Sequence, residues 1–441
     1  MSSPFGKKWV LLVSGSKGWA DYRHQADVCR AYQIMHRQGI LDEQIVVMMY
    51  DDIADNPENN SPRIIKNEPL GGDVYEGVPK DYTKADVTSS NFPAVLSGNK
   101  SKLSTGNASS RKVIQSNSKD TIFVYMTNHG GSGLFSFPAA HDVLHSEDLV
   151  NTLTEMADMH KFVQLVIFVE SCYSGSMLKN LPHNIPVYGI TASPPDKSSY
   201  AAFHDRWRGT YLADVYSAIW MDFVERNELE RTTFEELFKH LSFELWRQNL
   251  PRCQQYGNTG LSKLPLSSVL GTTSHERVVF ARKELRLTHL TVSHEVRHKI
   301  YQGKIESEKQ GAMKRDLETA YEEYKKKQRS MAKGVEIFKV HCSKGRCLVP
   351  KEQRELTSQS DFKRVTESFR EIFWDLHDEM LELTLPVPQV LLEVMEFNVD
   401  VEHIIEGIAL MRTVVDTFIP PARTRRRHIR RLRRELSMPV E

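Results

Sequence analysis

Two stretches of the chain, TIFVYMTNHGG at residues 121–131 and LVIFVESCYSG at residues 165–175, share one pattern. Each begins with a near-continuous apolar run and then changes abruptly to polar residues and glycine. Such runs are typical of strands that are buried on both faces, as in a parallel sheet covered by helices. Catalytic groups of open α/β sheets gather beyond the carboxyl ends of such strands. We therefore expect His129 and Cys172, which follow the two runs, to meet across one cleft.

The first 270 or so residues repeat this alternation of short apolar runs with helical patterns. The order predicts an α/β fold in which crossover helices flank a mostly parallel sheet. Ser97–Lys119 is polar and predicts a surface loop. Strands are expected at Trp9–Val13, Ile45–Met49, Thr121–Met126, Leu165–Val169 and Val187–Thr191, and helices at Arg23–Arg37 and Ser146–Met159, the latter with Ser146 as its N-cap.

The character of the sequence changes after Gly271, where strand-like alternation stops and charged residues dominate. Apolar residues then recur at helical spacing, which indicates a small helical bundle. We expect an α/β domain over residues 1–271, a linker over residues 272–315 and an all-helical region over residues 316–441. The helical segments are predicted at Arg315–Lys333, Ser360–Leu383, Gln389–Asn398 and Glu402–Val415.

The amino-acid composition excludes few classes of protein. The 441 residues are 26% charged and 40% apolar, with a formal net charge of +1, so no global charge attracts nucleic acid or membrane. No apolar run approaches the roughly 20 residues that span a bilayer. The start of the chain, Met1–Val13, has a short apolar run that indicates a first strand rather than a signal peptide.

One local charge field stands out near the C-terminus. Taken alone, it would suggest a nucleic-acid or acidic partner. A solvated tail explains it as well, and we expect no nucleic-acid partner. The cluster consists of Arg423, Arg425, Arg426, Arg427, Arg430, Arg431, Arg433 and Arg434.

A cysteine and a histidine at neighbouring strand ends are the components of a cysteine peptidase. Five cysteines leave at least one unpaired within the chain. Cys172 is then the candidate nucleophile and His129 its proton carrier. Gly130 exposes its backbone N–H, which together with the N–H of Cys172 can form an oxyanion hole. Either residue alone is more often structural, and only the combination favours catalysis.

Metal and nucleotide cofactors are not expected. No Cys/His spacing fits a zinc site, and Gly71-Gly72 does not lie between a strand and a helix as phosphate loops require. Hydrolysis by a Cys/His pair needs neither group.

Longer stretches in the same order resemble the legumains, the asparaginyl endopeptidases of the caspase-like cysteine peptidases, over most of residues 8–260. The resemblance implies a caspase-like catalytic domain. The stretches that carry it are GSKGW at 15–19, YRHQAD at 22–27, VVMMYDDIA at 46–54, GVPKDY at 77–82 and SSYA at 198–201.

The resemblance also implies roles for single residues. His129 and Cys172 are the catalytic pair. A carboxamide has one acceptor and two donors, so an asparagine pocket needs a cationic donor beside anionic acceptors. The residues at the matching motif positions are Arg23, His24, Glu170, Ser198 and Asp214.

Three positions depart from the legumain pattern. Asp21 stands where the family usually has an Asn that orients the catalytic His, and a carboxylate there holds imidazolium more strongly. Asn128 replaces the family's Asp before that His. The residues around Cys172 read ESCYSG instead of EACESG. These changes bear on rate and pH optimum more than on the identity of the nucleophile.

By the same resemblance, the helical region is a prodomain that covers the active site of a zymogen as an intramolecular inhibitor. Legumains cut themselves after Asn at this junction, but no Asn occurs between Asn258 and Asn398. Asp316 is the nearest acceptable processing site. The resemblance implies cleavage of protein and peptide substrates after Asn, and after Asp in acid, with transpeptidation as a side activity. It also implies a lysosomal, vacuolar or secreted location.

Two other functions fit parts of the sequence. A catalytic subunit of the GPI transamidase shares the His/Cys pair, but it would carry a membrane anchor and no prodomain. An inactive homologue could use the helical and arginine-rich region to bind partners. Labelling with a thiol-reactive Asn-peptide probe distinguishes the inactive homologue from the enzymes.

Overall fold

A computed structural model describes residues 6–104, 111–139, 142–272, 285–308, 311–343, 359–373, 384, 387–396, 399 and 401–418. The chain divides into two compact units, Met1–Gly303 and Lys304–Glu441.

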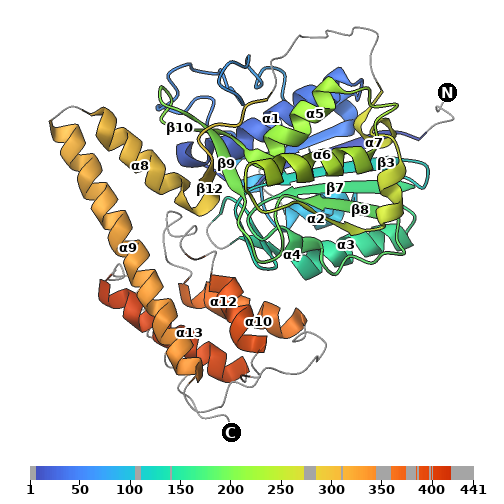
Figure 1. Ribbon diagram of the computed structural model, residues 1–441. Helices are drawn as coiled ribbons and strands as arrows, with labels where there is room; N and C mark the ends of the chain where they lie inside the picture. The colour runs from blue at the N-terminus through green and yellow to red at the C-terminus, as the bar shows by residue number, and fades with distance from the viewer. Residues whose placement is uncertain are drawn as a thin grey trace. The chain divides into compact units, whose positions relative to one another are not determined.

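The first unit is built on a six-stranded sheet of order β11-β8-β7-β3-β1-β2 (Figure 1). Neighbouring strands are parallel except β11, which is antiparallel to β8. Every residue of β7 is buried, as expected for a strand covered on both faces. The strands are β1 (Lys8–Ser14), β2 (Ile45–Met48), β3 (Thr121–Thr127), β7 (Gln164–Glu170), β8 (Val187–Thr191) and β11 (Gln254–Gly257).

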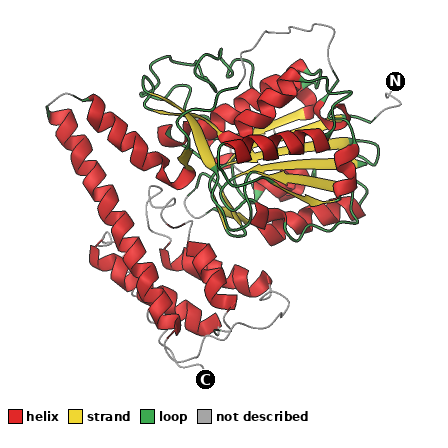
Figure 2. Cartoon of the chain, in the orientation of Figure 1, coloured by secondary structure: helices red, strands yellow, loops and turns green. Residues whose placement is uncertain are grey.

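Helices cover both faces of this sheet (Figure 2). Side chains alternate between faces along a strand, so β1 sends Val10 and Leu12 into one core and Leu11 and Val13 into the other. The first core is covered by α1 (Tyr22–Arg37), α5 (Val215–Arg226), α6 (Phe234–Arg247) and α7 (Ser267–Leu270), and the second by α2 (Asn91–Leu96), α3 (Ser146–Asp158) and α4 (Gly175–Leu178).

Two small antiparallel sheets and short 3-10 helices complete the first unit. One sheet follows the end of β3 and the other lies beside α1. They consist of β4 (Gly130–Gly131), β5 (Leu134–Ser136) and β6 (Val143–His145), and of β9 (Tyr200–Asp205), β10 (Thr210–Asp214) and β12 (Thr291–Val292). The 3-10 helices are η1 (Trp19–Asp21), η2 (Asp42–Gln44), η3 (Lys84–Asp86), η4 (Lys100–Lys102), η5 (Thr259–Lys263) and η6 (Ser293–Glu295).

The second unit is helical. Its core contains Phe338, Val365, Leu391 and Ile408, one from each of four helices among the described residues of this unit. These helices are α9 (Ala312–Ser343), α10 (Gln359–Phe373), α12 (Val387–Glu396) and α13 (Val401–Phe418), and α8 (Val296–Ser307) contains the division between the units.

The predicted fold class is confirmed, and two local predictions differ from the structure. The N-cap of α3 is His145, not Ser146, which is already the first helical residue. The predicted linker is not without structure, because β12 pairs with β9 and residues 285–303 belong to the first unit. The helix predicted over Ser360–Leu383 is seen to Phe373, and residues 374–383 lie outside the described residues, as do the C-terminal arginines.

Candidate active site

Strand register places the two candidate catalytic residues together. In the parallel pair β3–β7, Thr127 lies opposite Glu170. His129 and Cys172 each lie two residues beyond this pair, just past the carboxyl ends of β3 and β7. Both residues are buried, with 5% and 7% of their surface exposed. The β3 and β7 motifs therefore meet where an α/β sheet presents its active site.

Gly130 holds the histidine loop against the cysteine loop. A Cβ atom at this position would lie 2.5 Å from the carbonyl oxygen of Cys172 and 2.6 Å from the Oγ of Ser171. Real Cβ atoms do not approach a carbonyl oxygen so closely, so any side chain here would push the two loops apart. Glycine is thus required by packing, in addition to the oxyanion role that the sequence suggests.

Asp21 orients His129. Its Oδ1 lies 2.9 Å from His129 Nε2, and both side chains are buried. A carboxylate only accepts, so Nε2 carries the proton of this hydrogen bond. Burial raises the pKa of Asp21, but the charge and hydrogen bond of His129, then the charges of Arg297 and Arg23, outweigh burial and hold this pKa well below its usual range. Asp21 is therefore ionised at every physiological pH.

Cys172 is a protonated thiol at rest. Burial raises the pKa of the Cys172 thiol, although hydrogen bonds from Ser199 oppose the rise. The backbone N–H of Ser199 lies 3.3 Å from the sulfur. Tyr173, the next residue, adopts a φ of 57°, a left-handed conformation that side chains disfavour. The cysteine thus lies at a sharp, strained turn and needs a base to become a thiolate.

A buried charged cluster lies beside the cysteine. Arg23 Nε donates to Asp214 Oδ1 at 2.8 Å, and His24 Nε2 lies 3.4 Å from Asp214 Oδ2. Glu170 Oε2 accepts from the N–H and hydroxyl of Ser217, at 3.1 and 3.0 Å. Its other oxygen, Oε1, is buried and has no hydrogen-bond partner among the described residues. Glu170 thus has one acceptor available for a ligand.

The sequence places Ser198 in the same pocket, and the structure agrees in part. Ser198 lines a small cavity together with Glu170, Ser199 and Tyr200. Its hydroxyl lies 3.5 Å from His294 Nδ1. Asp316, the candidate processing residue, is exposed on α9 in the second unit.

The match to known families agrees with this geometry. A model described as the peptidase C13 family matches residues 8–272, which include every one of these residues except Asp316, His294 and Arg297. The chain belongs to the peptidase C13 family.

Relatives in this family are similar over the first unit. Rat legumain is 47% identical over 266 residues, 60% of each chain, and bovine legumain is 43% identical over 302 residues, 68% of each chain. The vacuolar-processing enzyme of Vicia sativa is 40% identical over 276 residues, covering 60% of this chain and 55% of that protein. The chain thus matches about three fifths of the length of most of these relatives. The predicted resemblance to legumains is confirmed.

Some residues that line this C13 site were missed by sequence reasoning. β12 pairs with β9, Ser293 donates its N–H to the carbonyl of Ser199 at 3.0 Å, and Arg297 Nη2 lies 3.8 Å from Asp21 Oδ2. The segment Thr291–Arg297 therefore adds a strand beside Cys172 and a cation beside Asp21. No motif marks it, because two strand residues and one arginine in a polar region have no distinctive pattern.

Three carboxyl groups around Arg23 have raised pKa values. Burial, then the charge of Asp214, raises the pKa of Glu170 and of Asp27 well above the usual range. Burial also raises the pKa of Asp214, although Arg23 opposes the rise. One arginine cannot offset three buried negative charges, so the cluster holds protons that the unfolded chain releases.

This cluster predicts that acid stabilises the first unit. Since the folded pKa values are raised, the stabilisation is complete below the unfolded value of about 4 and is lost as pH rises through the folded values. Asp21 acts in the opposite direction, because its stabilisation is lost as pH falls from the unfolded value of about 4 toward its lowered pKa. His24 also opposes the three carboxyl groups, since burial and then the charge of Arg23 hold its pKa well below the usual range, but it is one group against three. In a Cys172→Ala chain, Tm should rise as pH falls from 7.5 to 5, with each kcal/mol giving roughly 2–4 °C. Calorimetry measures this slope.

Glu170→Gln should flatten the slope, because the amide does not titrate. Glu230→Gln, the same change at an exposed residue, should leave it as in the parent. A Tm that falls between pH 7.5 and 5, or a Glu170→Gln profile that matches the parent, contradicts the assignment.

Two other features of the first unit resemble ligand-binding sites. One ligand atom from each of Asp21, His24 and His129 lies within 4.8 Å of the others, which could hold a metal ion. The cations Arg23 and Arg297 adjoin Asp21 and oppose a second positive charge there. A metal at this cluster would also break the bond that orients His129.

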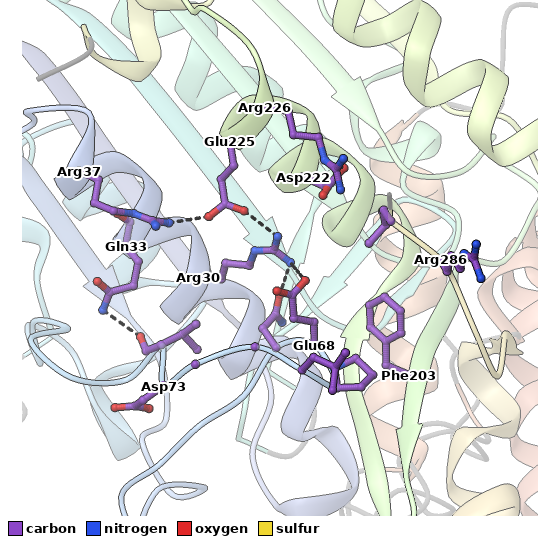
Figure 3. Close-up of a pocket in the computed structure, with 17 residues that line it drawn as sticks. Arg30, Gln33, Arg37, Glu68, Asp73, Phe203, Asp222, Glu225, Arg226 and Arg286 are labelled. Carbon is purple, nitrogen blue, oxygen red and sulfur yellow. Dashed lines mark hydrogen bonds and ion pairs between the residues drawn. The ribbon is translucent and has the colours of Figure 1, made fainter. Parts of the chain in front are cut away.

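A larger cavity of about 1070 Å³ lies over α1 and α5, away from Cys172 (Figure 3). Several of its charges are paired with one another: Arg30 lies 2.7 Å from Glu225 and 3.6 Å from Glu68, and Arg37 lies 2.5 Å from Glu225. Among the described helices, none is both long and apolar enough to cross a membrane.

Proposed function

We propose that this C13 family member is a cysteine endopeptidase that cleaves after Asn and, in acid, after Asp. The observation that carries the proposal is that His129 and Cys172 each lie two residues beyond one register pair, with His129 fixed by Asp21.

The chemistry requires no cofactor. His129 Nδ1 takes the thiol proton, and the sulfur attacks the scissile carbonyl carbon. The N–H groups of Gly130 and Cys172 stabilise the resulting oxyanion. The C–N bond then breaks as His129 returns the proton to the leaving amine, which leaves a thioester. Water hydrolyses the thioester, or an amine takes its place and forms a new peptide bond.

Asn specificity is proposed to come from the charged cluster. Arg23 donates to the carboxamide oxygen, while Glu170 and Asp214 accept from its NH₂ group, with His24 and Ser198 completing the pocket. Glu170 Oε1 supports this role, because it is a buried acceptor with no partner among the described residues.

The second unit is proposed to be an inhibitory prodomain of a zymogen, removed by self-cleavage after Asp316. Asp316 lies near the start of α9, whose first turns must unwind before an extended substrate strand can form there. Protein substrates and a lysosomal location are proposed from the resemblance to legumains, and a vacuolar location from the name of the Vicia sativa relative.

One experiment tests activity and processing together. Wild-type and Cys172→Ala chains are incubated at pH 4 with an Asn-containing reporter peptide, and new amino termini are read by mass spectrometry. We expect peptide cleavage after Asn and a new terminus at Leu317, both in wild type only. Cleavage of neither substrate rejects the peptidase, whereas peptide cleavage with another terminus, or with the same cut in both chains, rejects Asp316 alone.

A further inference from the structure

The second unit brings two histidines and a glutamate together on facing helices. His341 lies near the end of α9, and His403 and Glu406 lie one turn apart on α13. The two imidazole rings are stacked, with centroids 4.3 Å apart and planes at 20°. One ligand atom from each of the three residues lies within 4.8 Å of the others. We call this cluster the α9–α13 histidine cluster.

Close helix packing creates the cluster. Gly407 follows Glu406 on α13, and a Cβ atom there would lie 3.1 Å from the His341 ring and 3.0 Å from the Phe338 ring. The missing side chain lets both rings of α9 lie against the backbone of α13. The His341 ring is thereby brought beside His403, although the two residues are 62 positions apart in sequence.

The hydrogen bonding of His403 is typical of a metal ligand. Its Nε2 lies 3.3 Å from the carbonyl oxygen of His341, so Nε2 carries a proton and donates it. Its Nδ1 then faces the carboxylate of Glu406 at 3.7 Å. In the neutral ring, the lone pair of Nδ1 therefore faces the carboxylate of Glu406. These two acceptors have no proton between them. A bound cation resolves the conflict, and metal-binding histidines commonly donate their other N–H to a backbone carbonyl.

His341 supplies a second observation. Its Nε2 is buried and has no hydrogen-bond partner among the described residues. A buried ring nitrogen without a partner costs free energy unless a ligand uses it. The side chains of His403 and Glu406 are 34% and 67% exposed, so an ion can reach the cluster and keep a water ligand.

We propose that the α9–α13 histidine cluster binds one Zn²⁺ ion through His341, His403 and Glu406. Two imidazoles, one carboxylate and a water make a four-coordinate zinc site. Ligand atoms around a tetrahedral zinc lie roughly 3.3 Å apart, because each is about 2.0 Å from the ion. A side-chain shift of about 1 Å by the exposed residues therefore closes the site. The bound ion cross-links α9 to α13 and stabilises the second unit.

The sequence pattern predicts no zinc site, because it contains no compact Cys/His motif. Only His403 and Glu406 are close in sequence. The proposal is independent of peptidase activity, and an inactive homologue would bind the metal equally.

The test is a Co²⁺ titration of the full Cys172→Ala chain, followed by displacement with Zn²⁺. We expect one Co²⁺ per chain, with visible d–d absorption and no thiolate charge-transfer band. His403→Gln and Glu406→Gln should each weaken affinity by at least about 10–100-fold, since even changes around the ligands have effects of that size. Zinc should raise Tm in the parent but not in these variants.

Three variants serve as controls. Glu402→Gln makes the same change one turn earlier on α13, His36→Gln removes an exposed histidine that lies 3.1 Å from Asp42, and Asp21→Asn removes the cluster in the first unit. All three should retain the affinity of the parent. Because Glu406 is exposed, its variant tests the site even if His403→Gln does not fold. Absence of Co²⁺ binding, unchanged affinity in Glu406→Gln, or loss of binding in any control variant overturns the proposal.

Discussion

Cys172→Ala and His129→Ala are each expected to lower kcat/KM for an Asn-containing peptide by about 10⁴-fold or more. In the proposed mechanism the two residues act as one unit, since burial raises the pKa of the thiol and the sulfur becomes a nucleophile only when His129 takes its proton. For the same reason, the double variant should be no slower than the slower single variant. Steady-state kinetics on purified chains measures all three.

Cys253→Ser is the matched control, because Cys253 is also buried in the first unit and its sulfur already lies 3.2 Å from the hydroxyl of Ser242. It should keep near-normal turnover. Near-normal turnover in Cys172→Ala or His129→Ala, with a thermal melt like wild type, would falsify the assignment. Absence of turnover in a folded wild-type chain would instead favour the inactive homologue.

The second large effect concerns specificity. At pH 7 an Asn peptide is expected to be cleaved at least about 100-fold faster than its Asp counterpart, because a like-charge contact in a buried pocket costs several kcal/mol. The ratio of Asn to Asp cleavage should decrease as the pH is lowered, because protonated Asp resembles Asn. The Asp side chain has a pKa of about 4 in water. Burial raises the pKa of Glu170 and of Asp214, so the pocket itself gains protons first and Asp cleavage should begin to rise above pH 4.

Matched Asn and Asp peptides, assayed from pH 4 to pH 7, measure this ratio. Glu170→Gln should reduce the ratio wherever Glu170 is ionised, because the change removes one charge that repels ionised Asp, and Glu230→Gln should not. Equal Asn and Asp rates at pH 6.5, or a preference for Lys, Arg or aromatic residues, would contradict the proposed pocket.

The sheet could be predicted from the sequence because its strands are nearly uninterrupted apolar runs, and such runs need no tertiary information. The strand Val187–Thr191 was predicted at its exact bounds, and the others differ by one or two residues at their ends. His129 and Cys172 were found for the same reason, since polar residues directly after a buried strand stand out.

Residues that act only through tertiary contacts could not be predicted. Arg297 is one charge in a polar region until α8 brings it to Asp21, and His341 gains meaning only from His403 on another helix. The raised pKa of Glu170 could not be predicted either, because a single sequence does not show how many carboxyl groups share one arginine. Sequence patterns reveal structure formed by residues that are close in sequence. These sites depend instead on pairs of residues that are distant in sequence and meet only in the folded chain.

The shared register of β3 and β7 has a consequence for how the protein is made. The N-terminus of a chain emerges from the ribosome first, and domains generally fold as units as they emerge. A nascent chain that ends after β3 holds His129 but lacks the strand that carries the nucleophile, and Asp214 and Arg297 emerge later still. Nucleophile and base come together only when β7 adds to β3. A growing chain therefore cannot assemble the proposed catalytic pair until residues 164–170 have emerged and joined β3.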